Sequence, residues 1–314
     1  MKIAIVGTGG VGGYFGGKLA RSGHDVIFVA RGTHLQAIKT NGLQVKSING
    51  DFVVKQAKVT DNIKDIGTAE LIILGVKAWQ VKEIAGNLNE IIDNDTLVLP
   101  LQNGVLAAEE LAGEINPDHI LGGLCRIMSK IDSPGVINHF GIEPAIVFGE
   151  LNKVRTLRVE KIRELLDQAG IKGTISNDIH ADLWRKFIAI CVGGLLAVTR
   201  SDYGTVRMIK ETRTLMYDLL KEIYMISQKA GINVEPEYVD KTMSVIDSFP
   251  YDSSSSMARD IWEGKPSELD YQNGTAVKLG EKYGVDTPIN RFIYSCILPM
   301  ELRARGLSSR INNL

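Results

Sequence analysis

Four short apolar runs mark the first part of the chain. They cover residues 3–6, 26–29, 71–74 and 97–99, and each is apolar at every position. Continuous apolar runs of this length are typical of strands buried on both faces of a parallel sheet. Helical patterns lie around them at 13–22, 80–92 and 107–115. This order predicts βαβ units and a doubly wound sheet of the α/β class.

The pattern changes after residue 119. Strand-like runs at 120–125, 135–140 and 145–148 are expected to extend the same sheet, followed by a helix at 154–169 and a strand at 171–175. Beyond residue 175 the periodicity becomes helical, with helices expected at 179–198, 205–230, 236–247, 266–283 and 288–304. The low-complexity run Ser253–Ser256 is expected to be a loop. We therefore predict two domains, 1–175 and an all-helical 176–314.

Composition and charge exclude several classes of protein. The 314 residues carry a net charge of 36 − 37 = −1, so neither a disordered chain nor a basic nucleic-acid binder is expected. The longest apolar stretch, residues 187–198, is well short of the ~20 residues that cross a bilayer. Three scattered cysteines, Cys125, Cys191 and Cys296, are typical of a reduced protein in which they are buried. We expect a soluble cytoplasmic protein without nucleic-acid or membrane partners.

Glycine is enriched, with 32 residues against about 22 for average usage. Seven of these glycines lie within residues 7–17, where the chain reads Gly7-Thr8-Gly9-Gly10-Val11-Gly12. This GxGxxG pattern follows the first predicted strand and opens a predicted helix, as in a dinucleotide-binding Rossmann domain. The glycines allow a tight turn, close approach of a pyrophosphate and close packing of helix on strand. We assign all six residues to cofactor binding.

The end of the second predicted strand indicates which dinucleotide is bound. NAD sites commonly place a carboxylate about 20 residues after the glycine loop, where it holds the ribose hydroxyls. This chain has Val29-Ala30-Arg31-Gly32 instead. A guanidinium binds a 2′-phosphate through charge-assisted hydrogen bonds, so Arg31 predicts NADPH rather than NADH. The alternative is an ordinary surface arginine.

Further segments follow in a characteristic order. They are residues 75–80 (GVKAWQ), 100–104 (PLQNG), 183–187 (LWRKF), 255–260 (SSMARD) and 268–274 (ELDYQNG). Together with the N-terminal GxGxxG motif, they resemble the ketopantoate reductase (2-dehydropantoate 2-reductase) family along nearly the whole chain. The resemblance implies an NADPH-dependent reductase of a 2-oxo acid, with a Rossmann domain and a helical second domain.

The resemblance also implies roles for individual residues. By position, Lys186 matches the family's proton donor and also contacts substrate, and Glu268 matches a catalytic glutamate that lies near this lysine and the cofactor. Lys77 and Asn103 match cofactor-binding residues, Asn103 on the substrate side as well, and Ser256 matches a substrate-binding serine. The alternatives are a solvated surface side chain for Lys186 or Glu268, an N-cap or loop residue for Ser256 and a turn residue for Asn103.

The expected chemistry is consistent with these residue types. Hydride transfer to a carbonyl carbon leaves negative charge on the oxygen, which an ammonium group stabilises and protonates. Lys186 also attracts the substrate carboxylate, and Glu268 holds the lysine and accepts a bond from the substrate hydroxyl. We expect this site to lie between the two domains, where water is excluded.

The chain departs from the family pattern where substrate is expected. Asparagines usual four and eight residues after the lysine are replaced by Ile190 and Gly194, and a third is absent near Tyr203. Each lost amide leaves a polar substrate group without its hydrogen bond, at a cost of about 1–3 kcal/mol. A more hydrophobic 2-oxo acid, branched or aromatic, is therefore an alternative to ketopantoate.

We expect a reductase that converts 2-dehydropantoate to pantoate in pantothenate biosynthesis. The alternatives are a D-2-hydroxyacid dehydrogenase of the same family and a non-catalytic NADP-binding sensor. The histidines form no ligand cluster, so no metal is expected; they are His24, His34, His119, His139 and His180. A homodimer is one assembly that the sequence allows.

Overall fold

The computed structural model describes residues 1–307, so residues 308–314 of the predicted second domain lie outside the described chain. The chain forms two compact units. The first unit contains Met1–Gln102 and Leu106–Asp182, and the second contains Asn103–Val105 and the chain from Leu183 onward. The units divide at residues 182 and 183, whereas the sequence predicts a boundary at 175; this domain boundary stays a prediction. The assignment of Asn103–Val105 to the second unit was not expected.

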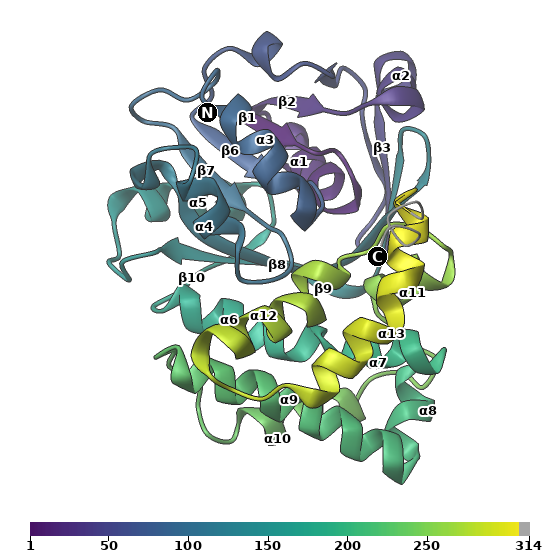
Figure 1. Cartoon of the computed structure of the whole chain (residues 1–314). Helices are drawn as coiled ribbons and strands as arrows, with labels where there is room; N and C mark the ends of the chain where they lie inside the picture. Colours follow the sequence, from purple (N-terminus) through teal and green to yellow (C-terminus); the bar gives the residue numbers. More distant parts are fainter. Residues whose placement is uncertain (308–314) are drawn as a thin grey trace. The chain divides into compact units, whose positions relative to one another are not determined.

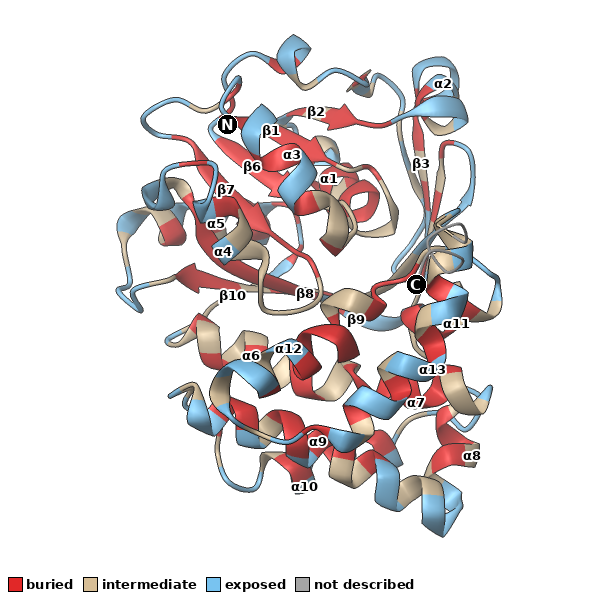
Figure 2. Cartoon of the chain, viewed as in Figure 1, coloured by how far each residue is buried: buried red, intermediate tan, exposed pale blue. Residues whose placement is uncertain are grey.

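A parallel five-stranded sheet forms the centre of the first unit (Figure 1). Its order is β5 (Lys58–Thr60), β2 (Asp25–Val29), β1 (Lys2–Val6), β6 (Leu71–Leu74) and β7 (Leu97–Pro100). Strands β1, β6 and β7 are almost wholly buried, as Figure 2 shows. Alternate side chains enter different apolar clusters, Ile3 and Ile5 on one face and Ala4 and Val6 on the other. The predicted α/β class with a doubly wound sheet is confirmed.

Apart from one parallel bridge between Ile120 and Val98 of β7, the strands after residue 119 do not extend that sheet, so this expectation is wrong. β8 (Leu121–Ser133) and β9 (Val136–Glu150) form a long antiparallel hairpin in a second five-stranded sheet with β3, β4 and β10. The remaining strands are β3 (Leu43–Ser47), β4 (Phe52–Val54) and β10 (Lys172–Ile175). Because β9 is long, its two halves pair in parallel with different strands, β3 at residues 136–139 and β10 at residues 145–148. We did not predict β3, although Leu43-Gln44-Val45-Lys46 alternates between apolar and polar residues, a pattern typical of a half-buried strand.

Helix α1 (Gly10–Arg21) packs between the two sheets, and its glycines permit this. A Cβ on Gly12 would lie 2.0 Å from the Gly7 carbonyl oxygen, and one on Gly16 would lie 2.6 Å from Ile5 of the first sheet. On the other side, a Cβ on Gly10 would lie 2.6 Å from the Ser129 carbonyl oxygen of β8, and one on Gly13 would lie 2.6 Å from Ile137 of β9. The backbone of α1 therefore contacts both sheets directly.

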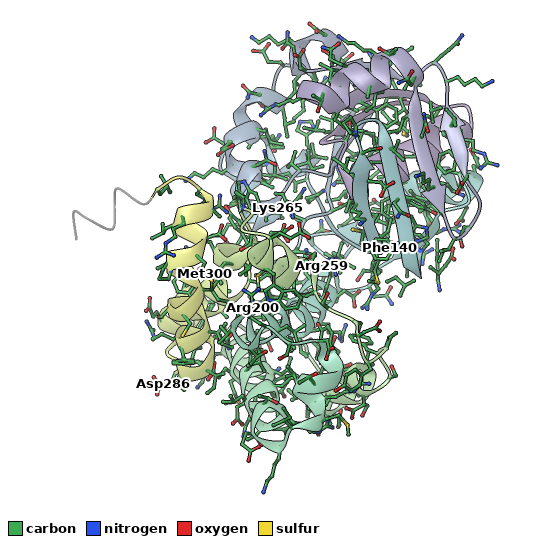
Figure 3. The ribbon with its side chains drawn as sticks, turned by 90° about the vertical axis from the view of Figure 1, so that its right-hand side faces the viewer. Phe140, Arg200, Arg259, Lys265, Asp286 and Met300 are labelled. Atoms are coloured by element: carbon green, nitrogen blue, oxygen red, sulfur yellow. The ribbon has the colours of Figure 1, made fainter. Side chains whose placement is uncertain are left out.

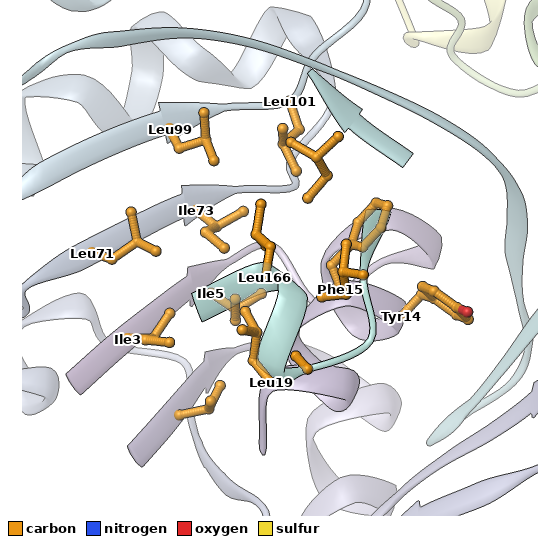
Figure 4. Packing of buried hydrophobic residues seen from close by; sticks show 14 of the residues in the cluster. Ile3, Ile5, Tyr14, Phe15, Leu19, Leu71, Ile73, Leu99, Leu101 and Leu166 are labelled. Atoms are coloured by element: carbon orange, nitrogen blue, oxygen red, sulfur yellow. The ribbon is translucent and has the colours of Figure 1, made fainter. Parts of the chain in front are cut away.

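Larger side chains of α1 form part of the apolar core beside these glycines. Figure 4 shows Phe15 and Leu19 packed with Ile5 and Ile73 of the first sheet and with Leu166. The other helices of the first unit are α2 (Gly32–Asn41), α3 (Val81–Leu88), α4 (Ala107–Ala112), α5 (Leu157–Gln168) and the short turns η1 (Ile63–Ile66), η2 (Ala78–Gln80) and η3 (Pro117–His119). Helix α2 was not predicted.

The second unit is helical, as expected. Its elements are α6 (Ile179–Ile190, which begins in the first unit), α7 (Val192–Thr199), α8 (Tyr203–Met208), α9 (Lys210–Lys229), α10 (Tyr238–Asp247), α11 (Ser256–Trp262), η4 (Leu269–Tyr271), α12 (Asn273–Tyr283) and α13 (Pro288–Ala304). Three predicted helices are each divided, at Cys191, at Ile209 and at Gln272. Of these residues, Ile209 has an extended backbone, whereas Cys191 keeps helical dihedral angles. Helix α11 was not predicted.

The cysteine expectation is wrong at one position. Cys125 and Cys191 are buried, but Cys296 is exposed on the same helix, α13, as the exposed Met300 (Figure 3). Within residues 1–307, no helix is long and apolar enough to cross a membrane. The same residues contain no group of three or more histidine, cysteine or acidic side chains that could hold a metal ion.

Replacing Gly12 by alanine tests the close packing of α1. The added methyl group would overlap the Gly7 carbonyl, so Gly12→Ala is expected to lower the free energy of unfolding by about 1–3 kcal/mol. The control is Gly86→Ala in α3, where the nearest atom to a new Cβ is 3.6 Å away and helix propensity favours alanine. Urea unfolding compares them, and equal midpoints for the two variants would contradict this packing.

Candidate functional site

The glycine-rich loop connects β1 to α1 in the first unit. Gly7 has φ +98°, and a Cβ there would lie 2.6 Å from the Val76 backbone nitrogen. Gly75, at the end of β6, approaches the Gly7 carbonyl equally closely, with 2.7 Å between that oxygen and a Cβ at residue 75. The sequence did not assign a role to Gly75, although a glycine directly after a buried strand is a signal for close backbone approach. The loop is therefore fixed against β6 by backbone contacts.

Gly9 differs from its neighbours because a Cβ at this position would meet no atom within 4 Å. It is the N-cap residue of α1, and no side chain caps the helix. Among the described residues, the N–H groups of Gly9 and Gly10 donate to no backbone acceptor. An uncapped helix N-terminus with open space in front binds phosphate groups well, because the free N–H groups and the helix dipole both favour negative charge. These features fit a dinucleotide pyrophosphate.

Arg31 lies at the N-cap of α2, directly after β2. Its side chain is exposed and forms no ion pair with the described residues. No side chain caps α2 either. A free guanidinium beside an uncapped helix start is suited to a phosphate monoester.

Lys77 follows β6 in the same unit. Its backbone N–H donates to the Gln80 side chain at 3.2 Å, and its Nζ lies 5.8 Å from the ring centroid of Trp79. Gln102, after β7, donates to the carbonyl oxygens of Leu74 and Val76 at 2.9 and 3.1 Å. The chain segments after β6 and β7 are thus held together, which places Lys77 at the same edge of the sheet as the glycine loop.

In the second unit, the structure brings Asn103 and Glu268 together. The Asn103 side chain donates to Glu268 Oε2 at 2.8 Å, across 165 positions of sequence. Glu268 is only 5% exposed and precedes η4. A Cβ on Gly104 would lie 2.9 Å from the Tyr271 carbonyl oxygen, so the short segment at 103–105 packs closely on η4. The Gln-Asn-Gly segment is therefore not only a turn, because Asn103 bonds Glu268 and Gly104 packs on η4.

Lys186 and Ile190 lie one turn apart on α6, and both are half-buried. The preceding residue, Arg185, anchors the helix. Its side chain pairs with Glu235 at 2.8 Å, and its carbonyl accepts a bond from the Tyr238 hydroxyl at 2.9 Å. These contacts fix the position of α6 and thus of Lys186. Ile190 is apolar and half-buried, and its contact with substrate stays a prediction.

Ser256 is the exposed first residue of α11, and it is not the helix cap. The neighbouring Ser255 takes that role, with its Oγ accepting from the Ala258 N–H at 3.0 Å. Arg259, labelled in Figure 3, bonds the Ser254 carbonyl at 3.1 Å, so the serine run is an ordered helix start. A Cβ on Gly193 would lie 2.6 Å from Ser255 Oγ, which places α7 against this start.

The absence of asparagine at two positions has a packing explanation. A Cβ on Gly194 would lie 2.2 Å from Asn273 Oδ1 and 2.6 Å from Ile293, so Gly194 is packed in the core. The Asn273 amide occupies this space and donates to the Cys191 carbonyl at 3.1 Å and to Asn290 at 2.9 Å. Tyr203 is also a core residue, and burial raises its pKa to about 12. Gly194 and Tyr203 are therefore core residues of the second unit, and the more apolar substrate wall stays a prediction.

Comparisons with known proteins cover most of the chain. Residues 3–153 match the family model described as "Ketopantoate reductase PanE/ApbA", and residues 178–301 match "Ketopantoate reductase PanE/ApbA C terminal". A 2-dehydropantoate 2-reductase of Nostoc sp. is 29% identical over 300 residues, 93% of each chain.

Solved structures share the fold over the same length. A PanE/ApbA family ketopantoate reductase from Ralstonia eutropha JMP134 has a TM-score of 0.90 and 28% identity, covering 97% of this chain and 100% of that one. A D-mandelate dehydrogenase, solved with NADH and anilino(oxo)acetate, has a TM-score of 0.89 and 25% identity, covering 97% and 99%.

A second carboxylate at residue 103 tests the contact between Asn103 and Glu268. Asn103→Asp places two carboxylates within hydrogen-bond distance, so it is expected to lower the free energy of unfolding at pH 8 by about 1–2 kcal/mol more than Asn103→Ala does. Acidification to about pH 4 protonates one carboxyl and restores a hydrogen bond, so the extra loss disappears. Urea unfolding at both pH values measures this. Equal losses for the two variants at pH 8 would exclude the contact.

Proposed function

Because the chain belongs to the ketopantoate reductase family, we propose that it is an NADPH-dependent reductase that converts a 2-oxo acid to a 2-hydroxy acid. The observation that carries this proposal is the open space at Gly9 in front of the uncapped start of α1, which suits a dinucleotide. The family's reaction makes 2-dehydropantoate the first candidate substrate, and pantothenate biosynthesis is then the pathway.

Arg31 favours NADPH over NADH. Its exposed guanidinium has no ion-pair partner among the described residues and stands where NAD-specific chains carry a carboxylate. A 2′-phosphate on the adenosine ribose supplies that missing anionic partner. Residues 7–12 hold the pyrophosphate in this proposal, and Lys77, at the same edge of the sheet, binds the cofactor ribose.

When bound, NADPH supplies the hydride, and the chain's own residues manage charge and protons. Lys186 attracts the substrate carboxylate, stabilises the negative charge that develops on the reacting oxygen, and donates a proton to it. Glu268 orients the lysine and accepts a bond from the resulting hydroxyl. The 2.8 Å bond from Asn103 holds the Glu268 carboxylate in one orientation. Ser256 binds substrate from the start of α11.

An assay of NADPH oxidation with a panel of 2-oxo acids tests this function. Wild-type protein is expected to turn over at least one of them, faster with NADPH than with NADH. Lys186→Met keeps the length of the side chain but removes its proton, so kcat should fall by about 10²–10⁴-fold. A kcat of Lys186→Met close to that of wild type would show that Lys186 is not the proton donor. Nucleotide binding without turnover by the wild type would identify a non-catalytic sensor.

A second candidate function has one specific observation in its favour. Ile190 places a half-buried apolar side chain one turn from Lys186, where the family pattern has an amide. Such a surface favours a branched or aromatic 2-oxo acid, which would make the protein a D-2-hydroxyacid dehydrogenase. D-mandelate dehydrogenase, which shares this fold, is named after an aromatic 2-hydroxy acid.

The variant Ile190→Asn distinguishes the two candidates. If Ile190 contacts substrate, the amide should shift the ratio of kcat/KM values toward 2-dehydropantoate, relative to phenylglyoxylate, by about tenfold or more. Ile190→Leu keeps the apolar character and is the matched control, expected to leave the ratio within about threefold. An unchanged ratio in Ile190→Asn would show that residue 190 does not select substrate.

A further inference from the structure

The imidazole of His34 bridges two segments of the first unit. Its Nδ1 accepts a hydrogen bond from the backbone N–H of Gly135, at 3.0 Å, at the tip of the β8–β9 hairpin. Its Nε2 lies 2.8 Å from the carbonyl oxygen of Thr8 in the glycine-rich loop. A backbone N–H only donates and a carbonyl only accepts. The ring is therefore neutral, with its proton on Nε2, and it donates to Thr8.

Both ends of this bridge are themselves fixed. Thr8 is 3% exposed, and its N–H and Oγ both donate to the Val29 carbonyl, at 3.1 and 2.9 Å. At the other end, the Gly135 carbonyl accepts from the Gln44 N–H of β3 at 2.9 Å, and a Cβ on Gly135 would lie 3.0 Å from the Ala37 Cβ of α2. The position of the ring is thus determined from both sides.

The Thr8 carbonyl shares one peptide plane with the N–H of Gly9. This peptide bond is trans, as are all those described in residues 1–307, so the N–H points opposite to the carbonyl that His34 holds. It donates to no backbone acceptor in the part of the chain that the structure describes, and open space lies beside it. Holding the carbonyl therefore sets the direction in which the Gly9 amide is presented.

We propose that His34 is a positioning residue for dinucleotide binding, which orients the Thr8–Gly9 peptide so that the Gly9 N–H faces the pyrophosphate. This inference rests on the proposed function, since it assumes that a dinucleotide occupies the loop. His34 follows Arg31 by three residues, so one helix, α2, both presents the guanidinium and holds the loop. The two residues have separable effects, because only Arg31 acts through the 2′-phosphate.

The bridge requires a neutral ring. Burial lowers the pKa of His34, partly offset by its bond to Thr8. Below that pKa, Nδ1 gains a proton that faces the Gly135 N–H, and the bridge is lost. The elements packed around the ring carry several other charged or titratable groups. They are Arg31 at the N-cap of α2, Lys39 of α2, Lys46 of β3, Arg126, Lys130 and Asp132 of β8, and His139, Glu143 and Glu150 of β9. Lys46 pairs with Asp132 at 3.0 Å. None of them contributes to the shift.

The dependence of nucleotide affinity on pH therefore distinguishes two possible roles of His34. If His34 acts by position, nucleotide affinity falls as pH decreases from 7 to 5. If it acted as a cation that attracts phosphate, affinity would rise over the same range. NAD⁺ is the ligand for this pH profile because it lacks the 2′-phosphate, a group that itself titrates near pH 6.

Calorimetric titration of the full chain with NADP⁺ and NAD⁺ tests the proposal. His34→Leu loses both bonds and is expected to weaken both nucleotides by the same factor, about fivefold. His34→Gln retains a donor for Thr8 and should bind both within about twofold of wild type. Arg31→Ala is the comparison, and it should weaken NADP⁺ while leaving NAD⁺ nearly unchanged.

The outcomes are distinguishable. A folded His34→Leu variant that binds both nucleotides as tightly as wild type overturns the positioning role and leaves the proposed function intact. Wild-type protein that binds neither nucleotide overturns both proposals. If His34→Leu does not fold, the pH profile decides. NAD⁺ affinity that falls in acid for wild type but not for His34→Gln supports the role, and parallel profiles contradict it.

Discussion

Direct backbone contact of helix α1 with two sheets is the constraint on which the first unit depends. Glycines on opposite sides of this helix remove the side chains that would otherwise separate it from β1 and from the β8–β9 hairpin. The turn that we propose for phosphate binding and the close packing of α1 thus depend on the same glycines. Gly12 satisfies the helix–strand packing, and Gly9 leaves space for a ligand, so one run of sequence serves both stability and binding. The glycine excess is concentrated where these two requirements coincide.

The charged residues of the proposed site are also placed by local contacts. The net charge of −1 says little about binding, because the relevant cations are few and placed individually. Arg31 stands free at the start of α2, and Lys186 is held on a helix anchored by Arg185 and Tyr238. In the second unit, the buried Glu268 accepts a bond from Asn103, a residue that the chain delivers from between two segments of the first unit. Each of these charged side chains is therefore positioned by a defined helix start, helix or hydrogen bond.

The sequence predicts those features that depend on local patterns. Strands β1, β2, β6 and β7 are continuous apolar runs because they are buried in a parallel sheet, and α13 begins at a proline as helices commonly do. Features that depend on partners distant in sequence were missed. The β8–β9 hairpin pairs with β3 rather than β7, Asn273 occupies the space beside Gly194, and His34 reaches Thr8 and Gly135. A single sequence carries no local signal for such contacts. The glycine loop and Arg31 were identified from motif and position, whereas five further site residues were identified by family resemblance: Lys77, Asn103, Lys186, Ser256 and Glu268. The roles of all of them remain proposals.

We propose that the start of α1 and the start of α2 together bind NADPH. Amide hydrogen exchange, with and without nucleotide, tests this most directly because it reports on each segment separately. NADP⁺ is expected to slow exchange in peptides that cover residues 7–13 and residues 31–35, whereas NAD⁺ should protect the first segment and leave the second largely unchanged. Saturating NADP⁺ that protects neither segment, or only segments elsewhere in the chain, would contradict the account.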